Sequence, residues 1–315
     1  MKRVCVLMLV LSFGLVGVAR GVNVTFGSGV NEFVMAFVEV GDAGNGDDDM
    51  YESPFGGTGY EYGIGKYEVS EDAVTKANGE GGLGITQSSR GANRPATGIS
   101  WNEAARFVNW LNTSEGYQAA YRFEFQPGDV GYSANQNILL WDSIDAWQLD
   151  GENLYRHKSA RYFLPSEDEW FKAAFYDGDL GVYYNYATAS DVTPTAVESG
   201  TLDGTAVFGR QSSPAEVFSA GGLSAYGTMG QSGNVFEWIE SADEAPNDLA
   251  AESRVLRGGI WNEPSPFLQS TSRIDAQTTY EDFGVGFRVA IVPEPSAMLM
   301  VFIGGIGMLC RRRRG

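Results

Sequence analysis

The sequence predicts an α+β domain that is rich in loops and short strands. Glycine is abundant, with 41 residues in a chain of 315, and only two segments show a convincing helical period. Short apolar segments with strand character surround these two helices, and glycine-rich turns separate them. This mixture favours one domain of irregular architecture over residues 22–292.

The first 21 residues are typical of a secretory signal peptide. A basic start at residues 2–3 precedes the apolar run Val4–Val18, and the small residues Ala19 and Gly21 follow. The run is shorter than the roughly 20 residues of a membrane-spanning helix. We therefore predict a signal peptide over residues 1–21 that is cleaved after Gly21.

Four segments of the body have the composition of strands. In chain order they are Phe33–Val40, Tyr60–Tyr67, Val255–Leu256 and Gly286–Ile291. Each is rich in β-branched and aromatic residues, which fit a pleated and partly buried surface. Their wide spacing along the chain suits a mixed domain.

Both predicted helices begin with a capping box. Ser100 stands three residues before Glu103, and Ser166 stands three residues before Glu169. Apolar residues with helical spacing follow each box, namely Ala104, Phe107, Val108 and Leu111 in the first helix and Trp170, Ala173 and Ala174 in the second. We expect both helices to serve as core scaffold.

Charge and residue counts exclude several classes of function. The net charge is −18, and seven of the 22 basic residues lie in the two terminal segments, so the body is still more acidic and no nucleic acid partner is expected. Cys5 and Cys310 both lie in terminal apolar runs, which excludes an internal disulfide or a cysteine nucleophile. His157 is the single histidine, no nucleophile elbow accompanies it, and no carboxylate pair is selected by spacing. We therefore predict no catalytic residue.

The chain closes with three elements in a fixed order. Pro293-Glu294-Pro295 precedes an apolar run over residues 296–310, and Arg311–Arg314 follow. Residues 293–315 thereby resemble the PEP-CTERM sorting and anchor segment of Gram-negative-type bacteria. The resemblance implies an exosortase-type partner, transient membrane anchoring through this segment, and a place in the cell envelope, at the cell surface or in the extracellular matrix. A simple tail anchor is the alternative, and it also places the body outside the cytoplasm.

Five further segments resemble, in order, the sulfatase-modifying factor family, also called formylglycine-generating-enzyme-like domains. They are Ile64–Ser70, Ile99–Ala104 with Asn109–Leu111, Phe163–Trp170, Gly233–Trp238 and Arg254–Asn262, closed by Gly284–Arg288. The resemblance implies a C-type-lectin-like fold and does not by itself imply the activity. We expect Trp170, Trp238 and Trp261 to fill the core, and Arg288 to pair with a buried carboxylate.

The sequence departs from the formylglycine-generating enzymes at their redox site. Those enzymes carry two copper-holding cysteines shortly after the segment matched by Gly258-Gly259, and the corresponding positions are Glu263 and Leu268. Neither side chain offers sulfur for Cu(I) or for disulfide exchange. The iron-dependent relatives need several histidine ligands. We therefore expect neither copper nor iron, and no formylglycine-generating activity.

The resemblance also implies a structural calcium site. Its ligands would be the carbonyl groups of Gly233 and Val235 and the side chain of Glu237, with Gly230 standing where a fourth ligand usually lies. Calcium needs only oxygen ligands, so its site survives the loss of redox residues. Alternatively, Glu237 is a hydrogen-bonded or paired carboxylate of the core. The sequence leaves both interpretations open.

Aromatic residues outside the family segments suggest a binding function. Trp141, Trp147 and the segment Tyr183–Tyr186 either face ligands or pack beneath long loops. We predict an exported, surface-sorted and non-catalytic binding or matrix-associated module whose ligand is an extracellular polysaccharide or peptide. The alternative is an enzyme of unknown chemistry, with oxidoreductase-like family ancestry, that uses the same cleft.

Overall fold

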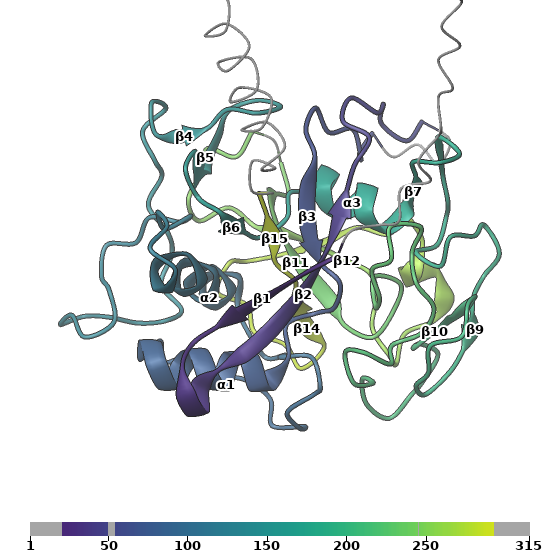
Figure 1. The fold of residues 1–315 in the computed structure, drawn as a ribbon, viewed down its shortest axis with the longest axis horizontal. Helices are drawn as coiled ribbons and strands as arrows, with labels where there is room; N and C mark the ends of the chain where they lie inside the picture. Colours follow the sequence, from purple (N-terminus) through teal and green to yellow (C-terminus); the bar gives the residue numbers. More distant parts are fainter. Residues whose placement is uncertain (1–20, 50–53, 245, 293–315) are drawn as a thin grey trace, which may run out of the picture.

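A five-stranded antiparallel sheet joins the beginning, the middle and the end of the domain (Figure 1). The computed structural model describes residues 21–49, 54–244 and 246–292. In sheet order the strands are β1 (Val22–Phe26), β2 (Phe33–Val40), β3 (Tyr62–Gly65), β15 (Ala290–Ile291) and β6 (Tyr162–Phe163). The last strand in the sequence, β15, therefore lies between two strands from much earlier in the chain, β3 and β6.

A second sheet carries the segments that follow residue 235. In sheet order its strands are β13 (Ile274–Ala276), β12 (Arg254–Arg257), β11 (Phe236–Ala242) and β14 (Val285–Phe287). The contact between β11 and β14 is parallel, and the others are antiparallel. The prediction of one strand over Gly286–Ile291 is wrong, because β14 and β15 belong to different sheets and Arg288 lies between them. The uninterrupted apolar pattern of this segment conceals the change of sheet.

Three helices and several short elements complete the described part of the chain. The helices are α1 (Glu71–Gly81), α2 (Trp101–Ser114) and α3 (Glu167–Phe175). The short strands are β4 (Ala146–Trp147), β5 (Asn153–His157), β7 (Tyr176–Asp177), β8 (Val182–Tyr183), β9 (Thr195–Ala196) and β10 (Thr205–Ala206), and the 3-10 helices are η1 (Gly29–Asn31) and η2 (Ser265–Leu268). Helix α2 contacts β6, whereas α3 contacts β3 and β11 and so touches both large sheets. None of the helices in residues 21–49, 54–244 and 246–292 combines the length and apolarity needed to cross a membrane.

Both predicted capping boxes are confirmed. The Ser100 hydroxyl accepts the Glu103 N–H, and the Glu103 carboxylate accepts the Ser100 N–H. Ser166 and Glu169 exchange the same two bonds at the start of α3. Helix α1 was not expected from the sequence, because Ser70 caps it without a carboxylate three residues later.

The expected core residues are also confirmed. Trp170 and Trp238 are fully buried, and Trp261 is 4 % exposed. Two indole N–H groups tie α2 to β11, because Trp101 donates to the Ile239 carbonyl and Trp238 donates to the Ile99 carbonyl. These reciprocal bonds satisfy polar groups that burial would otherwise leave without a partner.

Candidate functional site

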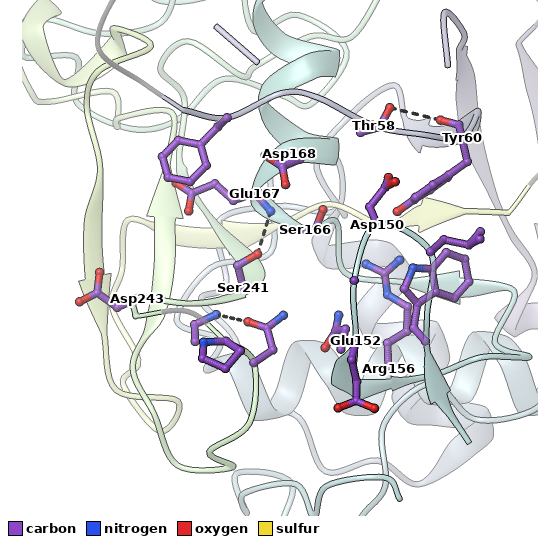
Figure 2. A pocket seen from close by; sticks show the side chains of 18 of the residues that line it. Thr58, Tyr60, Asp150, Glu152, Arg156, Ser166, Glu167, Asp168, Ser241 and Asp243 are labelled. Carbon is purple, nitrogen blue, oxygen red and sulfur yellow. Dashed lines mark hydrogen bonds between the residues drawn. The ribbon is translucent and has the colours of Figure 1, made fainter. Parts of the chain in front are cut away.

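A cleft of about 520 Å³ opens beside the N-terminus of helix α3 (Figure 2). Five segments that are distant in the sequence form its walls: residues 55–60, residues 147–156, residues 166–168, the described residues of 241–247, and Arg273. Its acidic lining residues are Asp150, Glu152, Glu167, Asp168 and Asp243, and its basic ones are Arg156 and Arg273. The cleft therefore carries an excess of negative charge.

Arg156 forms the floor of the cleft. Its buried guanidinium binds the carboxylates of Glu169, at 2.9 Å, and Glu240, at 2.7 Å. The same group lies 3.7 Å from the centre of the Phe163 ring and 4.9 Å from that of Trp147. Burial on its own would raise the pKa of Glu169, but the charge of Arg156 lowers it below its ordinary value.

Hydroxyl and amide groups complete this buried network. Tyr60 donates to Glu169 at 2.6 Å, and Tyr121 donates to Glu240 at 2.7 Å. The side-chain amide of Asn153 donates to Glu240 at 2.6 Å. With these partners both carboxylates are satisfied, and the network acts as a rigid floor for the cleft.

Glu167 organises the opposite wall. Its carboxylate accepts hydrogen bonds from Arg257, at 2.8 Å, and from Arg273, at 3.0 Å. Arg273 also pairs with Asp243. The Glu167 N–H donates to the Ser241 hydroxyl at 2.9 Å, which joins the first turn of α3 to strand β11 (Figure 2). Both acidic residues of this wall are therefore matched by arginine.

Three other carboxylates of the cleft have no ion pair with a described arginine or lysine. Within the part of the chain that the structure describes, Asp150, Glu152 and Asp168 form no ion pair. Asp168 accepts the Gly56 N–H at 3.0 Å, and Asp150 accepts the Gly59 N–H at 2.7 Å. Burial, reinforced by neighbouring carboxylates, raises the pKa of Asp168 to about 7. A carboxyl group that titrates near neutrality in a cleft marks a candidate functional position.

Sequence reasoning did not single out this cleft. Asp168 lies within a motif that was interpreted only as a helix start, and Asp150 and Glu152 lie in a loop without a recognisable pattern. No local signal identifies them, since only the fold brings the five segments of the cleft together. Trp147 was noted among the aromatic residues, and it does line the cleft.

The predicted calcium residues lie elsewhere, at the start of β11. Both carboxylate oxygens of Glu237 accept hydrogen bonds from Arg288, and one of them also accepts the Trp170 indole N–H at 2.7 Å. This confirms the expected pairing of Arg288 with a buried carboxylate. A guanidinium on both oxygens does not suit a cation at the same carboxylate, so the geometry favours the paired interpretation of Glu237.

The calcium site itself stays a prediction. Gly233 donates its N–H to the Gly258 carbonyl at 2.7 Å, and Val235 is fully buried beside it. In residues 21–49, 54–244 and 246–292, no three acidic, histidine or cysteine side chains are grouped to hold a metal ion. Carbonyl ligands from Gly233 and Val235 would therefore have to supply most of such a site.

Of the two positions that the family resemblance aligns with the redox cysteines, Leu268 packs in the core and Glu263 makes a backbone hydrogen bond. Leu268 is fully buried in an apolar cluster with Tyr186, Ala206 and Phe208. The Glu263 carbonyl accepts the Gly209 N–H at 2.8 Å. None of the described residues that line the acidic cleft comes from the segment 258–268. The cleft is therefore not built from the segment that matches the redox site of the relatives.

His157 and several aromatic residues serve packing. The Nδ1 atom of His157 accepts the Ser159 N–H at 3.0 Å, and the imidazole lies 4.7 Å from the Trp141 ring. Tyr183 and Tyr186 are 7 % and 2 % exposed, as expected if they pack beneath long loops. Of the aromatic residues proposed for binding, Trp147 is the one that borders the cleft.

Comparison with known families identifies the chain. Residues 28–292 match the family described as the sulfatase-modifying factor enzyme 1-like domain. The chain belongs to this family. Residues 292–314 of this sulfatase-modifying-factor-like protein match the PEP-CTERM protein-sorting motif. That motif points to export and surface sorting in bacteria by exosortase-type machinery. The predicted signal peptide and sorting segment lie outside the described residues, except for Gly21.

Solved structures show the same fold at low sequence identity. Treponema denticola variable protein 1 superimposes with a TM-score of 0.57 and 21% identity, covering 87% of this chain and 99% of that one. CarF superimposes with a TM-score of 0.56 and 20% identity, covering 82% of this chain and 99% of that one. PvdO from Pseudomonas aeruginosa superimposes with a TM-score of 0.52 and 17% identity, covering 86% of this chain and 98% of that one. No curated protein matches significantly. The predicted α+β, C-type-lectin-like fold of the formylglycine-generating enzymes is thus confirmed.

Proposed function

We propose that this sulfatase-modifying-factor-like protein is a non-catalytic binding module, displayed at the cell surface or in the extracellular matrix, that holds an extracellular ligand in the acidic cleft. The observation that carries the proposal is the cleft itself. It combines a rigid buried floor around Arg156, aromatic side chains, and three carboxylates whose charge no arginine or lysine pairs with in the described part of the chain. Concave sites with a few well-placed polar groups are where ligands usually bind.

The redox positions support the absence of formylglycine-generating chemistry. Oxidation of a cysteine by a copper-bound cysteine pair needs sulfur at both positions. Leu268 supplies a buried hydrocarbon, and Glu263 supplies a carboxylate. We therefore expect the purified protein to leave the cysteine of a sulfatase-motif peptide unchanged, whereas an active member of the family converts it to an aldehyde. Mass spectrometry of the peptide distinguishes the two outcomes.

A ligand screen tests the binding function. The exported protein, purified from the cell envelope in detergent, is titrated calorimetrically with extracellular polysaccharides and with peptides, and each mixture is analysed for new products. Saturable binding without turnover supports the proposal. Leu149→Ser keeps the charge of the cleft but removes exposed apolar surface from its lining, so ligand affinity should fall. If no ligand of the screen binds, the binding function is wrong and a structural role at the cell surface is favoured.

One observation favours the second candidate, an enzyme of unknown chemistry in the same cleft. Burial raises the pKa of Asp168 to about 7, which is the range that a general acid or base requires near neutrality. Turnover of a bound ligand that disappears in Asp168→Asn, with binding retained, would establish this alternative and overturn the non-catalytic proposal.

A further inference from the structure

The cleft has more carboxylates than arginines, and this excess of negative charge favours a cationic ligand. Both guanidinium groups in the lining are committed, Arg156 to Glu169 and Glu240 and Arg273 to Glu167 and Asp243. The Arg156 cluster holds two carboxylates for one guanidinium, so it leaves no positive charge to spare. Asp150, Glu152 and Asp168 therefore face the cleft without an ion-pair partner among the described residues, although Lys172 attracts Asp150 and Arg257 attracts Asp168 at longer range.

Each of these three carboxylates uses one oxygen and leaves the other available. Asp168 accepts the Gly56 N–H through Oδ1, and Asp150 accepts the Gly59 N–H through Oδ2. Glu152 accepts the Ser143 hydroxyl and the Gln148 amide through Oε1. No hydrogen bond from residues 21–49, 54–244 or 246–292 reaches Oδ2 of Asp168, Oδ1 of Asp150 or Oε2 of Glu152. Ionised carboxylates only accept hydrogen bonds, so a ligand must supply donors.

The apolar part of the lining suits an aliphatic chain better than a sugar ring. Trp147 is only 7 % exposed, its ring lies 4.9 Å from the Arg156 guanidinium, and the Tyr60 ring meets it edge-on at 5.6 Å. Sugar stacking requires an open aromatic face, which these contacts restrict. Leu149, in contrast, lines the cleft and is 54 % exposed. It offers apolar surface directly beside the unpaired carboxylates.

We propose that the cleft binds a long cationic side chain, lysine or arginine, presented by an extracellular polypeptide. The aliphatic stem would lie along Leu149 and the edge of Trp147, and the charged tip would donate to Asp168 and Asp150. This proposal rests on the proposed binding function and names its ligand class. Lysine and arginine bury their stems against apolar surface and keep a charged head for polar partners, which is the combination that this lining matches.

Titration of Asp168 supports the same ligand. Its carboxyl group has a pKa raised to about 7, first by burial and then by neighbouring carboxylates, against the lowering effect of the Gly56 N–H. The charged groups around it are Asp47 from the loop before β3, Glu167 and Glu169 from α3, and Arg257 from β12. A cation favours the ionised form, so binding displaces the proton. Since lysine stays protonated between pH 6 and pH 8, affinity should rise by about tenfold over that interval.

The experiment compares blocked tetralysine with the same peptide acetylated on every side-chain amine, by calorimetry with the full chain in detergent. We expect tetralysine to bind and acetylation to weaken binding by at least about tenfold. Asp168→Asn and Asp150→Asn should each weaken it by a similar factor, and the pH dependence should vanish in Asp168→Asn. Asp203→Asn is the matched control, because it removes one equal charge from an exposed loop outside the cleft.

Several outcomes overturn the proposal. Equal binding of the acetylated peptide would show that the amine is not recognised. Equal losses in Asp203→Asn and in the cleft variants would show only a general attraction to an acidic surface. Tighter binding of tetraglucosamine, which has the same number of amines, would assign the site to an amino polysaccharide. If the more buried Asp168→Asn variant misfolds, Asp150→Asn still tests the proposal. Thermal unfolding of each variant verifies that it is folded.

The outcomes also separate this inference from the proposed function. If another ligand of the screen binds and neither Asp168→Asn nor Asp150→Asn affects it, the binding function stands and the cationic ligand is wrong. If no ligand of any class binds the wild-type protein, both proposals are wrong.

Discussion

Arg288 binds the carboxylate of Glu237 through its Nε and Nη2 atoms at the point where the chain passes from one sheet to the other. Both side chains are fully buried. Arg288 also donates to the carbonyl groups of Gly65 and Met229, at 2.8 and 2.9 Å. One side chain thereby joins β11, the end of β3 and the loop before β11.

Removal of this arginine should destabilise the domain strongly. Arg288→Ala leaves the buried charge of Glu237 without its partner, which typically costs about 3–5 kcal/mol. Denaturant unfolding measures the loss. Arg122→Ala is the control, since Arg122 is exposed and makes a single long hydrogen bond, so its free energy of unfolding should change by less than about 1 kcal/mol. Similar losses in both variants would contradict the role assigned to Arg288.

The buried carboxyl group of Glu68 should make stability depend on pH. Burial and the nearby Glu237 raise the pKa of Glu68 from 4.5 to about 8, and its Oε1 accepts the Asn234 amide at 2.8 Å. The folded protein holds this proton more tightly than the unfolded chain does. The contribution of the protonated Glu68 to the free energy of unfolding is therefore retained below pH 4.5. It is lost as the pH rises toward 8, by up to about 1.4 kcal/mol per pH unit.

Glu68→Gln should remove that dependence. The variant should gain stability relative to the wild type between pH 5 and pH 8, as followed by the melting temperature across a pH series. Glu39→Gln, an exposed position on β2, should leave the wild-type curve unchanged. Parallel pH curves for Glu68→Gln and the wild type would refute the assignment.

Leu268 should behave as a packing residue. Truncation to alanine empties part of the cluster formed with Tyr186 and Phe208, and we expect a loss of about 2–5 kcal/mol in the free energy of unfolding. Leu202→Ala, at a side chain that is 74 % exposed, serves as the comparison and should have little effect. A tolerated Leu268→Ala would mean that this position is free to carry other chemistry.

Removal of calcium separates the two interpretations of Glu237. Because Arg288 engages both carboxylate oxygens, we expect the same melting temperature in excess chelator and in excess Ca²⁺. Mg²⁺ at equal ionic strength controls for general salt effects. A melting temperature that rises specifically with Ca²⁺ would restore the calcium interpretation for Gly233, Val235 and Glu237.

Local signals in the sequence were sufficient where a feature is built from neighbouring residues. The boxes at Ser100 and Ser166 span four residues each, and they located the starts of α2 and α3. Helix α1 lacks such a box and ends among glycines, so its weaker pattern did not predict it. The charge of Arg288 predicted a buried acidic partner, although it did not identify Glu237.

The cleft could not be predicted from the sequence, because its residues come together only in the folded domain. Its carboxylates come from the loop before β5, from the first turn of α3 and from the residue after β11, and its other walls come from residues 55–60 and Arg273. Counting Asp and Glu in a strongly acidic chain does not reveal which of them lack a cation. That distinction appears only when the arginines are placed, because Arg156 and Arg273 are committed to other carboxylates.

Strand β15 has a mechanical consequence for a surface-sorted protein. It is hydrogen-bonded to β3 on one side and to β6 on the other, and directly after it the Val292 N–H donates to the Arg161 carbonyl at 2.9 Å. Tension applied at residue 292 is therefore shared by two ladders in the interior of the sheet, whereas an edge strand could be peeled away one bond at a time. The end of the domain that leads into the sorting motif is therefore held from both sides.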